Sequence, residues 1–191
     1  MASGHFLAHA TEAIDEHAQH RQMALQKTAT IYSSHDYQVP EISLIDMNYQ
    51  AVSLPAAFVS DKPVVVNFIY TTCTTICPIL SATFSQIQRE LGADATGLRM
   101  VSISIDPEQD SPERLQGYSR RFKSSANWHF LTGDIDDIVN LQKALDAYRG
   151  DKMNHIPLTF LYSAKADTWI RMEGFPSTAE IVAEYRQLLA Q

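Results

Sequence analysis

An apolar, β-branched run leads directly into a pair of cysteines in the segment Pro63-Val64-Val65-Val66-Asn67-Phe68-Ile69-Tyr70-Thr71-Thr72-Cys73-Thr74-Thr75-Ile76-Cys77-Pro78. A short continuous run of this kind is typical of a strand that is buried on both faces of a sheet. Beyond it, apolar residues recur with helical spacing at Leu80, Phe84, Ile87 and Leu91. The segment therefore predicts a buried strand, a turn that carries both cysteines, and a helix that ends near Gly92.

Strands and helices alternate along the rest of the chain. We expect a hairpin over 41–54, strands at 98–105, 158–162 and 169–173, and helices after 111, from 134 to about 148, and after 177. Ser111 followed by Pro112 is a typical helix start, because serine caps free N–H groups and proline needs none. The alternation predicts a parallel sheet core, and the closing strand-strand-helix order predicts a terminal hairpin. This order is that of an α/β, thioredoxin-like fold.

The chain is long enough for one domain with a full core and too short for two. It has 191 residues, of which 45% are hydrophobic. Residues 1–30 contain no proline and one glycine, Gly4, which favours an extra N-terminal helix outside the main domain. We therefore expect a histidine-bearing helical extension at 1–35 and a thioredoxin-like domain with an N-terminal β-hairpin at 36–191.

Charge and hydropathy exclude several classes of protein. The net charge of -7 argues against a nucleic-acid partner, because phosphate binding needs clustered lysine and arginine. No stretch reaches the roughly 18 apolar residues of a membrane span. The start at 1–5 lacks the basic and apolar regions of an export signal. We expect either a cytosolic protein or a soluble part from which a leader or anchor has been removed.

The spacing of Cys73 and Cys77 indicates chemistry at one site. Residues four apart on a helix share a face, with their Cβ atoms roughly 5–6 Å apart. The pair follows a buried strand, where ligands of open α/β sheets bind, and the helix dipole there favours the thiolate. Two thiolates suit a soft ion such as Cu(I) or form a reversible disulfide. A closed zinc site needs four ligands, and the chain has two cysteines.

From about Glu41 to its C-terminus, the sequence resembles the Sco/SenC family of copper-binding, thioredoxin-like proteins. A C-x3-C-P motif, an S-x-D-P segment and a late histidine carry the resemblance together with an aromatic segment. In this chain they read Cys73-Thr74-Thr75-Ile76-Cys77-Pro78, Ser104-Ile105-Asp106-Pro107, Asn154-His155 and Trp128-His129-Phe130-Leu131-Thr132-Gly133. The combination is far more specific than any one of these motifs alone.

The resemblance implies a copper site and a role in copper delivery. In the family the two cysteines and the late histidine bind copper, which here are Cys73, Cys77 and His155. We expect Cu(I) foremost, with Cu(II) as a second form. Family members deliver copper to the dinuclear copper centre of cytochrome c oxidase or serve other copper enzymes. The implied partners are a copper donor and a copper-enzyme client, and the implied location is periplasmic, with a membrane anchor in the full-length form.

The sequence departs from the family pattern around the site. Many members have an acidic residue and valine before the second cysteine, where this chain has Thr75-Ile76. Where the family usually has an Asp-His pair, this chain has Asn154-His155. The Pro-Asp-Gly turn that the family usually has in the last hairpin is absent from 162–167. These changes predict a divergent branch of the family.

Two other functions fit parts of the pattern. The first is a thiol–disulfide oxidoreductase in which Cys73 and Cys77 are the catalytic redox pair and keep the cysteines of a copper-protein client reduced. The C-x3-C spacing weighs against a general exchanger, which usually has C-x2-C. The second is a peroxidase, which needs threonine three residues before its reactive cysteine, where this chain has Tyr70. Of these three functions, only copper binding requires a histidine at the position of His155.

Two residues near the predicted site have more than one interpretation. Asp106 ends the strand beside the cysteine loop and either lies at the site or only starts a turn with Pro107. Pro157, in the loop that enters a strand opposite the cysteines, is a candidate for a cis peptide bond.

The N-terminal segment is a candidate for secondary metal capture. On a helical wheel one arc of roughly 120° collects copper-ligating residue types. They are His5, His9, His17, His20 and Met23. The same arc also fits the solvated face of a helix that docks through its apolar residues, or a helix that binds a partner. The family resemblance does not extend to this segment.

Overall fold

Strand β4 (Val64–Ile69) lies at the centre of the protein, and all six of its side chains are buried in the computed structural model. The structure describes residues 29–91 and 98–191. β4 pairs in parallel with β5 (Arg99–Ser104) and in antiparallel fashion with β7 (Leu158–Ser163). The β-branched run therefore forms the expected strand buried on both faces, and the cysteines follow its carboxyl end.

Eight strands form one mixed sheet in the order β1-β8-β7-β4-β5-β6-β2-β3. The others are β1 (Ile31–His35), β2 (Ser43–Asp46), β3 (Ala51–Ser53), β6 (Trp128–Thr132) and β8 (Thr168–Glu173). The parallel pairs β4–β5 and β5–β6 form the predicted parallel core. The antiparallel pairs β2–β3 and β7–β8 confirm the two predicted hairpins.

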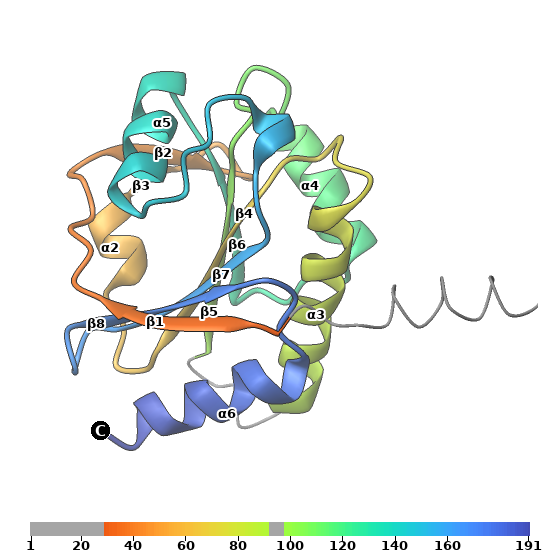
Figure 1. Ribbon diagram of the computed structural model, residues 1–191. Helices are drawn as coiled ribbons and strands as arrows, with labels where there is room; N and C mark the ends of the chain where they lie inside the picture. The colour runs from red at the N-terminus through yellow and green to blue at the C-terminus, as the bar shows by residue number, and fades with distance from the viewer. Residues whose placement is uncertain (1–28, 92–97) are drawn as a thin grey trace, which may run out of the picture.

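Helices cover both faces of the sheet (Figure 1). They are α2 (Leu54–Phe58), α3 (Ile76–Leu91), α4 (Pro112–Arg121), α5 (Ile135–Ala144), α6 (Thr178–Leu189) and the 3-10 turn η2 (Lys152–Asn154). Helices α3 and α4 lie on one side and α2 and α5 on the other, while α6 contacts α3 and β7 (Figure 1). None of the helices in the described residues is long and apolar enough to cross a membrane.

The predicted helix starts are confirmed by their caps. The side chain of Ser111 accepts a hydrogen bond from the backbone N–H of Arg114 at the start of α4. Ser177 and Glu180 form a capping box at the start of α6, in which each side chain accepts from the backbone N–H of the other. Such local contacts fix where a helix begins, and they are legible in the sequence.

Four parts of the predicted order are wrong. Strands β1 and β6 and the short helix α2 were not expected, and α5 ends at Ala144 instead of near Tyr148. α5 stops because Asp146 has a φ of 48°, a left-handed conformation that a helix does not continue through. β1 lies at the sheet edge with Ile31 and Tyr32 exposed, so only its pairing with β8 defines it.

The sheet also begins earlier than the predicted domain limit. β1 occupies 31–35, which were assigned to the helical extension, and its five residues pair with β8. The extra helix and the secondary metal residues His5, His9, His17, His20 and Met23 lie outside the described residues. The helical extension and its metal-binding role therefore stay predictions.

Candidate metal centre

A tight loop between β4 and α3 holds the two cysteines. The backbone N–H of Cys73 donates to the carbonyl oxygen of Tyr70 over 3.1 Å, which turns the chain out of the strand. Cys77 lies in the first turn of α3, and its backbone N–H points at the Cys73 sulfur, with 3.4 Å from N to Sγ. The C-x3-C spacing thus brings both sulfurs to the start of the helix, as predicted.

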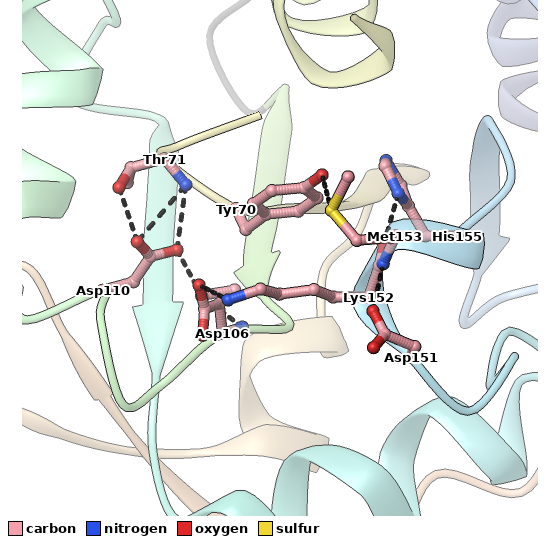
Figure 2. A network of polar contacts seen from close by, with 9 residues as sticks. Tyr70, Thr71, Asp106, Asp110, Asp151, Lys152, Met153 and His155 are labelled. Atoms are coloured by element: carbon pink, nitrogen blue, oxygen red, sulfur yellow. Dashed lines mark hydrogen bonds and ion pairs between the residues drawn. The ribbon is translucent and has the colours of Figure 1, made fainter. Parts of the chain in front are cut away.

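A buried carboxylate in the loop after β5 anchors the cysteine loop. Asp110 is fully buried and accepts hydrogen bonds from the backbone N–H of Thr71 at 3.0 Å and its hydroxyl at 2.5 Å (Figure 2). The hydroxyl of Ser104, at the end of β5, donates to the Oδ2 of the same carboxylate over 2.6 Å. The loop after β5 therefore fixes the conformation of the cysteine loop.

The histidine comes from a short turn on the other side of the site. Asp151 caps η2 by accepting from the backbone N–H of Met153 over 2.7 Å. His155 follows this turn, and its Nδ1 lies 2.7 Å from the carbonyl oxygen of Lys152. Because a carbonyl oxygen only accepts, Nδ1 carries the proton and Nε2 keeps a free lone pair. The turn thus selects the tautomer that binds a metal through Nε2.

Three ligand atoms converge between the loop and the turn. One ligand atom each from Cys73, Cys77 and His155 lies within 4.8 Å of the others, and the Nε2 of His155 is 3.6 Å from the Sγ of Cys77. Both cysteines are buried, and the histidine is half-buried. Two soft sulfurs and one imidazole nitrogen fit a three-coordinate Cu(I) ion better than zinc, which takes a fourth ligand.

An ion pair joins the histidine turn to the loop after β5. The Nζ of Lys152 lies 2.5 Å from the Oδ2 of Asp106, whose side chain is 6% exposed (Figure 2). The backbone carbonyl oxygen of Lys152 orients His155, so Lys152 connects this loop to the imidazole. Asp106 therefore lies beside the site, as one of its two interpretations predicted, but it acts through Lys152.

Tyr70 closes the site on the side of the histidine. Its ring meets the His155 ring edge to face, with centroids 5.1 Å apart, and its hydroxyl donates to the Sδ of Met153 over 3.7 Å. Tyr70, Lys152 and Met153 were not predicted from the sequence to lie at the site. Their contacts join segments up to 83 positions apart, and no local pattern carries such information.

The two cysteines differ in acidity. Burial raises the pKa of the Cys73 thiol, but hydrogen bonds from the backbone of Cys77 and Thr75 to its sulfur outweigh burial, and the net pKa is lowered. Burial raises the pKa of the Cys77 thiol far above its ordinary value. Burial lowers the pKa of His155, so its imidazole is neutral at pH 7 and available as a ligand.

Pro157 does not have the cis peptide bond for which it was a candidate. The peptide bond before it is trans, as are all peptide bonds of the described residues.

A cavity of about 340 Å³ opens beside His155, between the histidine turn and α5, and Asp106, Tyr148 and Arg149 also line it. The histidine is therefore reached from outside, in contrast to the two sulfurs.

Comparison with known proteins places the chain in a family. The SCO1/SenC family model matches residues 33–190. The SCO1 protein homolog of Bacillus subtilis is 33% identical over 99 residues, which cover 51% of this chain and 50% of that protein. The chain thus spans about half the length of this curated relative.

Solved structures agree with the assignment at the level of the fold. BsSco, a member of the Sco family of cytochrome c oxidase assembly proteins, is 24% identical with a TM-score of 0.69, over 84% of this chain and 98% of that one. The copper-bound ScoI of Bradyrhizobium japonicum is 24% identical with a TM-score of 0.65, over 78% and 98%. With a thioredoxin-like fold and a family match over most of its length, the chain belongs to the SCO1/SenC family.

Proposed function

We propose that the protein is a copper-binding metallochaperone that holds one Cu(I) ion between Cys73, Cys77 and His155. The observation that carries the proposal is the convergence of their three ligand atoms within 4.8 Å of one another. A single metal ion bound to all three needs little rearrangement of the loop or the turn.

The donor set favours Cu(I) over Cu(II). Thiolates are soft ligands that select Cu(I), whereas Cu(II) prefers four or more nitrogen and oxygen ligands in a tetragonal arrangement. The site offers two sulfurs and one nitrogen, and both sulfurs are buried. Cu(II) binding is therefore expected to be the weaker of the two and to need ligands from water or from a partner.

The proposed task is delivery of copper to a copper enzyme. BsSco, which shares the fold, is an assembly protein of cytochrome c oxidase, and this supports an oxidase subunit as one candidate client. A second partner has to supply the copper. We place this exchange on the periplasmic side of the membrane, with the full-length protein anchored there, in keeping with the location implied by the family resemblance.

The cysteine pair supplies a redox gate for the metal. Oxidation of the two thiols by the disulfide of a partner removes two electrons, forms the bond between the sulfurs of Cys73 and Cys77, and leaves the partner as a dithiol. A disulfide no longer offers thiolate ligands, so copper binds only to the reduced protein. Reduction of the pair restores the site.

The unequal acidity of the cysteines favours a second function, that of a thiol–disulfide reductase. The thiolate of Cys73, whose pKa is lowered, attacks one sulfur of a client disulfide and forms a mixed disulfide. Cys77, whose pKa is raised, then gives up its proton and displaces the client as a dithiol. The two electrons come from the cysteine pair, which ends as a disulfide.

A Cu(I) titration in competition with a chelator distinguishes the two functions. The reduced chain of 191 residues is titrated without oxygen in the presence of bicinchoninate, beside His155→Ala and Cys73→Ser/Cys77→Ser. His129→Ala is the matched control, because His129 lies on β6 and is not one of the proposed ligands. The metallochaperone predicts one tightly bound equivalent that His155→Ala weakens, the double variant loses and the control keeps.

Two other results have clear meanings. If the wild-type protein holds no copper against the chelator, the metal function fails and the reductase remains. Copper that stays bound to the double cysteine variant would indicate the predicted N-terminal histidine site.

A further inference from the structure

Met153 presents a soft sulfur ligand at the surface, next to the copper site. Its side chain is 72% exposed, and it is the only exposed methionine in the described ranges 29–91 and 98–191. Met100 and Met172 are fully buried, and Met47 packs against the core. Exposure of one apolar residue is ordinary on a protein surface, so its meaning depends on what lies around it.

The position of the Met153 sulfur is defined by the site itself. The hydroxyl of Tyr70 donates to its Sδ over 3.7 Å, and the ring of Tyr70 packs edge to face on His155 (Figure 2). Tyr70 also starts the cysteine loop, because its carbonyl oxygen accepts from the backbone N–H of Cys73 over 3.1 Å. Met153 is also two residues before His155, and two residues span at most about 7 Å. The thioether is therefore held against Tyr70, the residue that contacts the histidine and starts the cysteine loop.

The two sulfur ligands of the proposed centre are poorly placed to receive copper directly. Cys73 is 4% exposed and Cys77 is fully buried. A Cu(I) ion carried by a donor has to exchange its ligands one at a time, and each exchange needs an incoming soft donor that the copper reaches from outside. Among the described residues around the site, the exposed soft donor is Met153.

We propose that Met153 is a copper exchange ligand, whose thioether receives Cu(I) at the surface, passes it to the centre formed by Cys73, Cys77 and His155, and takes it up again on release. This inference rests on the proposed function and adds the route by which the metal moves.

The steps balance without any change in the oxidation state of copper. A bond forms between copper and the Sδ of Met153 while one ligand of the donor leaves, and the weak contact with the Tyr70 hydroxyl breaks. The sulfurs of Cys73 and Cys77 and the Nε2 of His155 then bind copper as the remaining ligands of the donor leave, with thiol protons passing to water, and the thioether dissociates. A thioether is neutral and carries no proton, so it gains and loses copper without acid–base chemistry.

The test compares the rate of copper transfer with the affinity for copper. The Cu(I)-loaded chain of 191 residues is mixed with excess bathocuproine disulfonate in a stopped-flow instrument, and the reverse transfer is followed from the Cu(I)–bicinchoninate complex. Met153→Leu removes the sulfur at similar size, and Met47→Leu is the control for loss of a methionine elsewhere. Met153→His tests rescue, because imidazole is also a copper ligand.

Met153→Leu is expected to slow transfer in both directions by about tenfold, which equals about 1.4 kcal/mol on the barrier, with the equilibrium affinity changed less than about twofold. Met47→Leu is expected to match the wild type, and Met153→His to recover at least part of the rate.

Two results would overturn the inference and leave the proposed function standing. One is a Met153→Leu protein that binds copper and transfers it at the wild-type rate. The other is a loss of affinity as large as the loss of rate, which would make Met153 a resident ligand. A wild-type protein that binds no Cu(I) would overturn both the inference and the metallochaperone function.

Discussion

The cysteine loop and the histidine turn face each other across the site, yet the protein builds them in different ways. The loop after β4 carries two buried sulfurs and is anchored by the fully buried carboxylate of Asp110. The turn around η2 is largely at the surface, and its contacts include the capping hydrogen bond that Asp151 accepts, the ion pair of Lys152, and the ring and hydroxyl contacts of Tyr70. The cysteine loop is thus part of the core, whereas the histidine turn lies at the surface and is held to the core by these contacts.

Because of this difference, we expect the two sides of the site to control different properties of a copper carrier, namely its affinity for copper and the exchange of copper with partners. Segments with few buried apolar contacts open locally at low free-energy cost, whereas core segments open only with the whole domain. The buried sulfurs are therefore expected to provide most of the affinity. The histidine turn, which moves more easily, is expected to adjust the affinity and to control exchange with partners.

The largest expected effect is on the core side. Cys77→Ser removes a thiolate with little change in size, and we expect Cu(I) affinity to fall by at least about 1000-fold, equivalent to about 4 kcal/mol. Competition with bicinchoninate measures the loss, and thermal unfolding checks that the variant folds. A loss below about tenfold would mean that the buried sulfur is not a ligand.

The second effect is on the turn side and should be smaller. We expect His155→Ala to lower Cu(I) affinity by about 10- to 100-fold, equivalent to about 1.4–2.8 kcal/mol, because two soft thiolates remain and an imidazole is the less soft ligand. His129→Ala is expected to leave the affinity unchanged. If His155→Ala cost as much as Cys77→Ser, the two sides of the site would be equivalent and the comparison would fail.

The two sides also differ in how far the sequence predicted them. The cysteine side was predicted almost completely, because a buried β-branched strand, the C-x3-C spacing and a helical pattern are all local signals. The position of His155 was inferred from the family resemblance. The ion pair of Lys152 with Asp106 was missed, since the partners are 46 positions apart and neither segment marks the other.

The same distinction explains the errors in the fold. The hairpins and helix caps depend on neighbouring residues, and they were predicted correctly. β1 has the sequence Ile-Tyr-Ser-Ser-His, which has no clear alternation of apolar and polar residues, and it is a strand only because β8 offers a free edge. Pairing with a strand that is distant in the sequence can thus override the local propensity of the residues that form a strand.

The third prediction concerns pH and the unequal acidity of the cysteines. The pKa of Cys77 is raised, so at neutral pH its sulfur keeps a proton that copper has to expel. Raising the pH makes this easier, and we expect Cu(I) affinity to rise by at least about tenfold per pH unit between pH 7 and 8. The pKa of His155 is lowered, so its imidazole is already neutral in this range and adds no slope.

The control for the pH prediction is a cysteine variant. Cys77→Ser has no thiol proton at this position. A plot of the logarithm of its Cu(I) affinity against pH should therefore have a slope smaller by about one than that of the wild-type protein. Affinity measured by chelator competition at several pH values gives both slopes. Equal slopes in the two proteins would show that Cys77 is not the group that releases the proton.

The smallest effect is expected from the attachment of the histidine turn. Lys152→Met combined with Asp106→Asn removes both charges of the ion pair without leaving a buried carboxylate unpaired. We expect Cu(I) affinity to fall by less than about tenfold, because the Lys152 carbonyl that orients His155 remains. Lys165→Met, in the turn between β7 and β8, is the control for loss of a surface lysine. An unchanged affinity in the double variant would show that the ion pair does not position the histidine.

X-ray absorption at the copper edge of the reduced protein, loaded anaerobically with one equivalent of Cu(I), tests the central claim most directly. We predict a three-coordinate Cu(I) ion with two sulfur ligands and one imidazole nitrogen, and in His155→Ala a first shell without that nitrogen. A first shell without sulfur, or one that is identical in the wild-type protein and His155→Ala, would contradict the assignment of Cys73, Cys77 and His155 as the copper site.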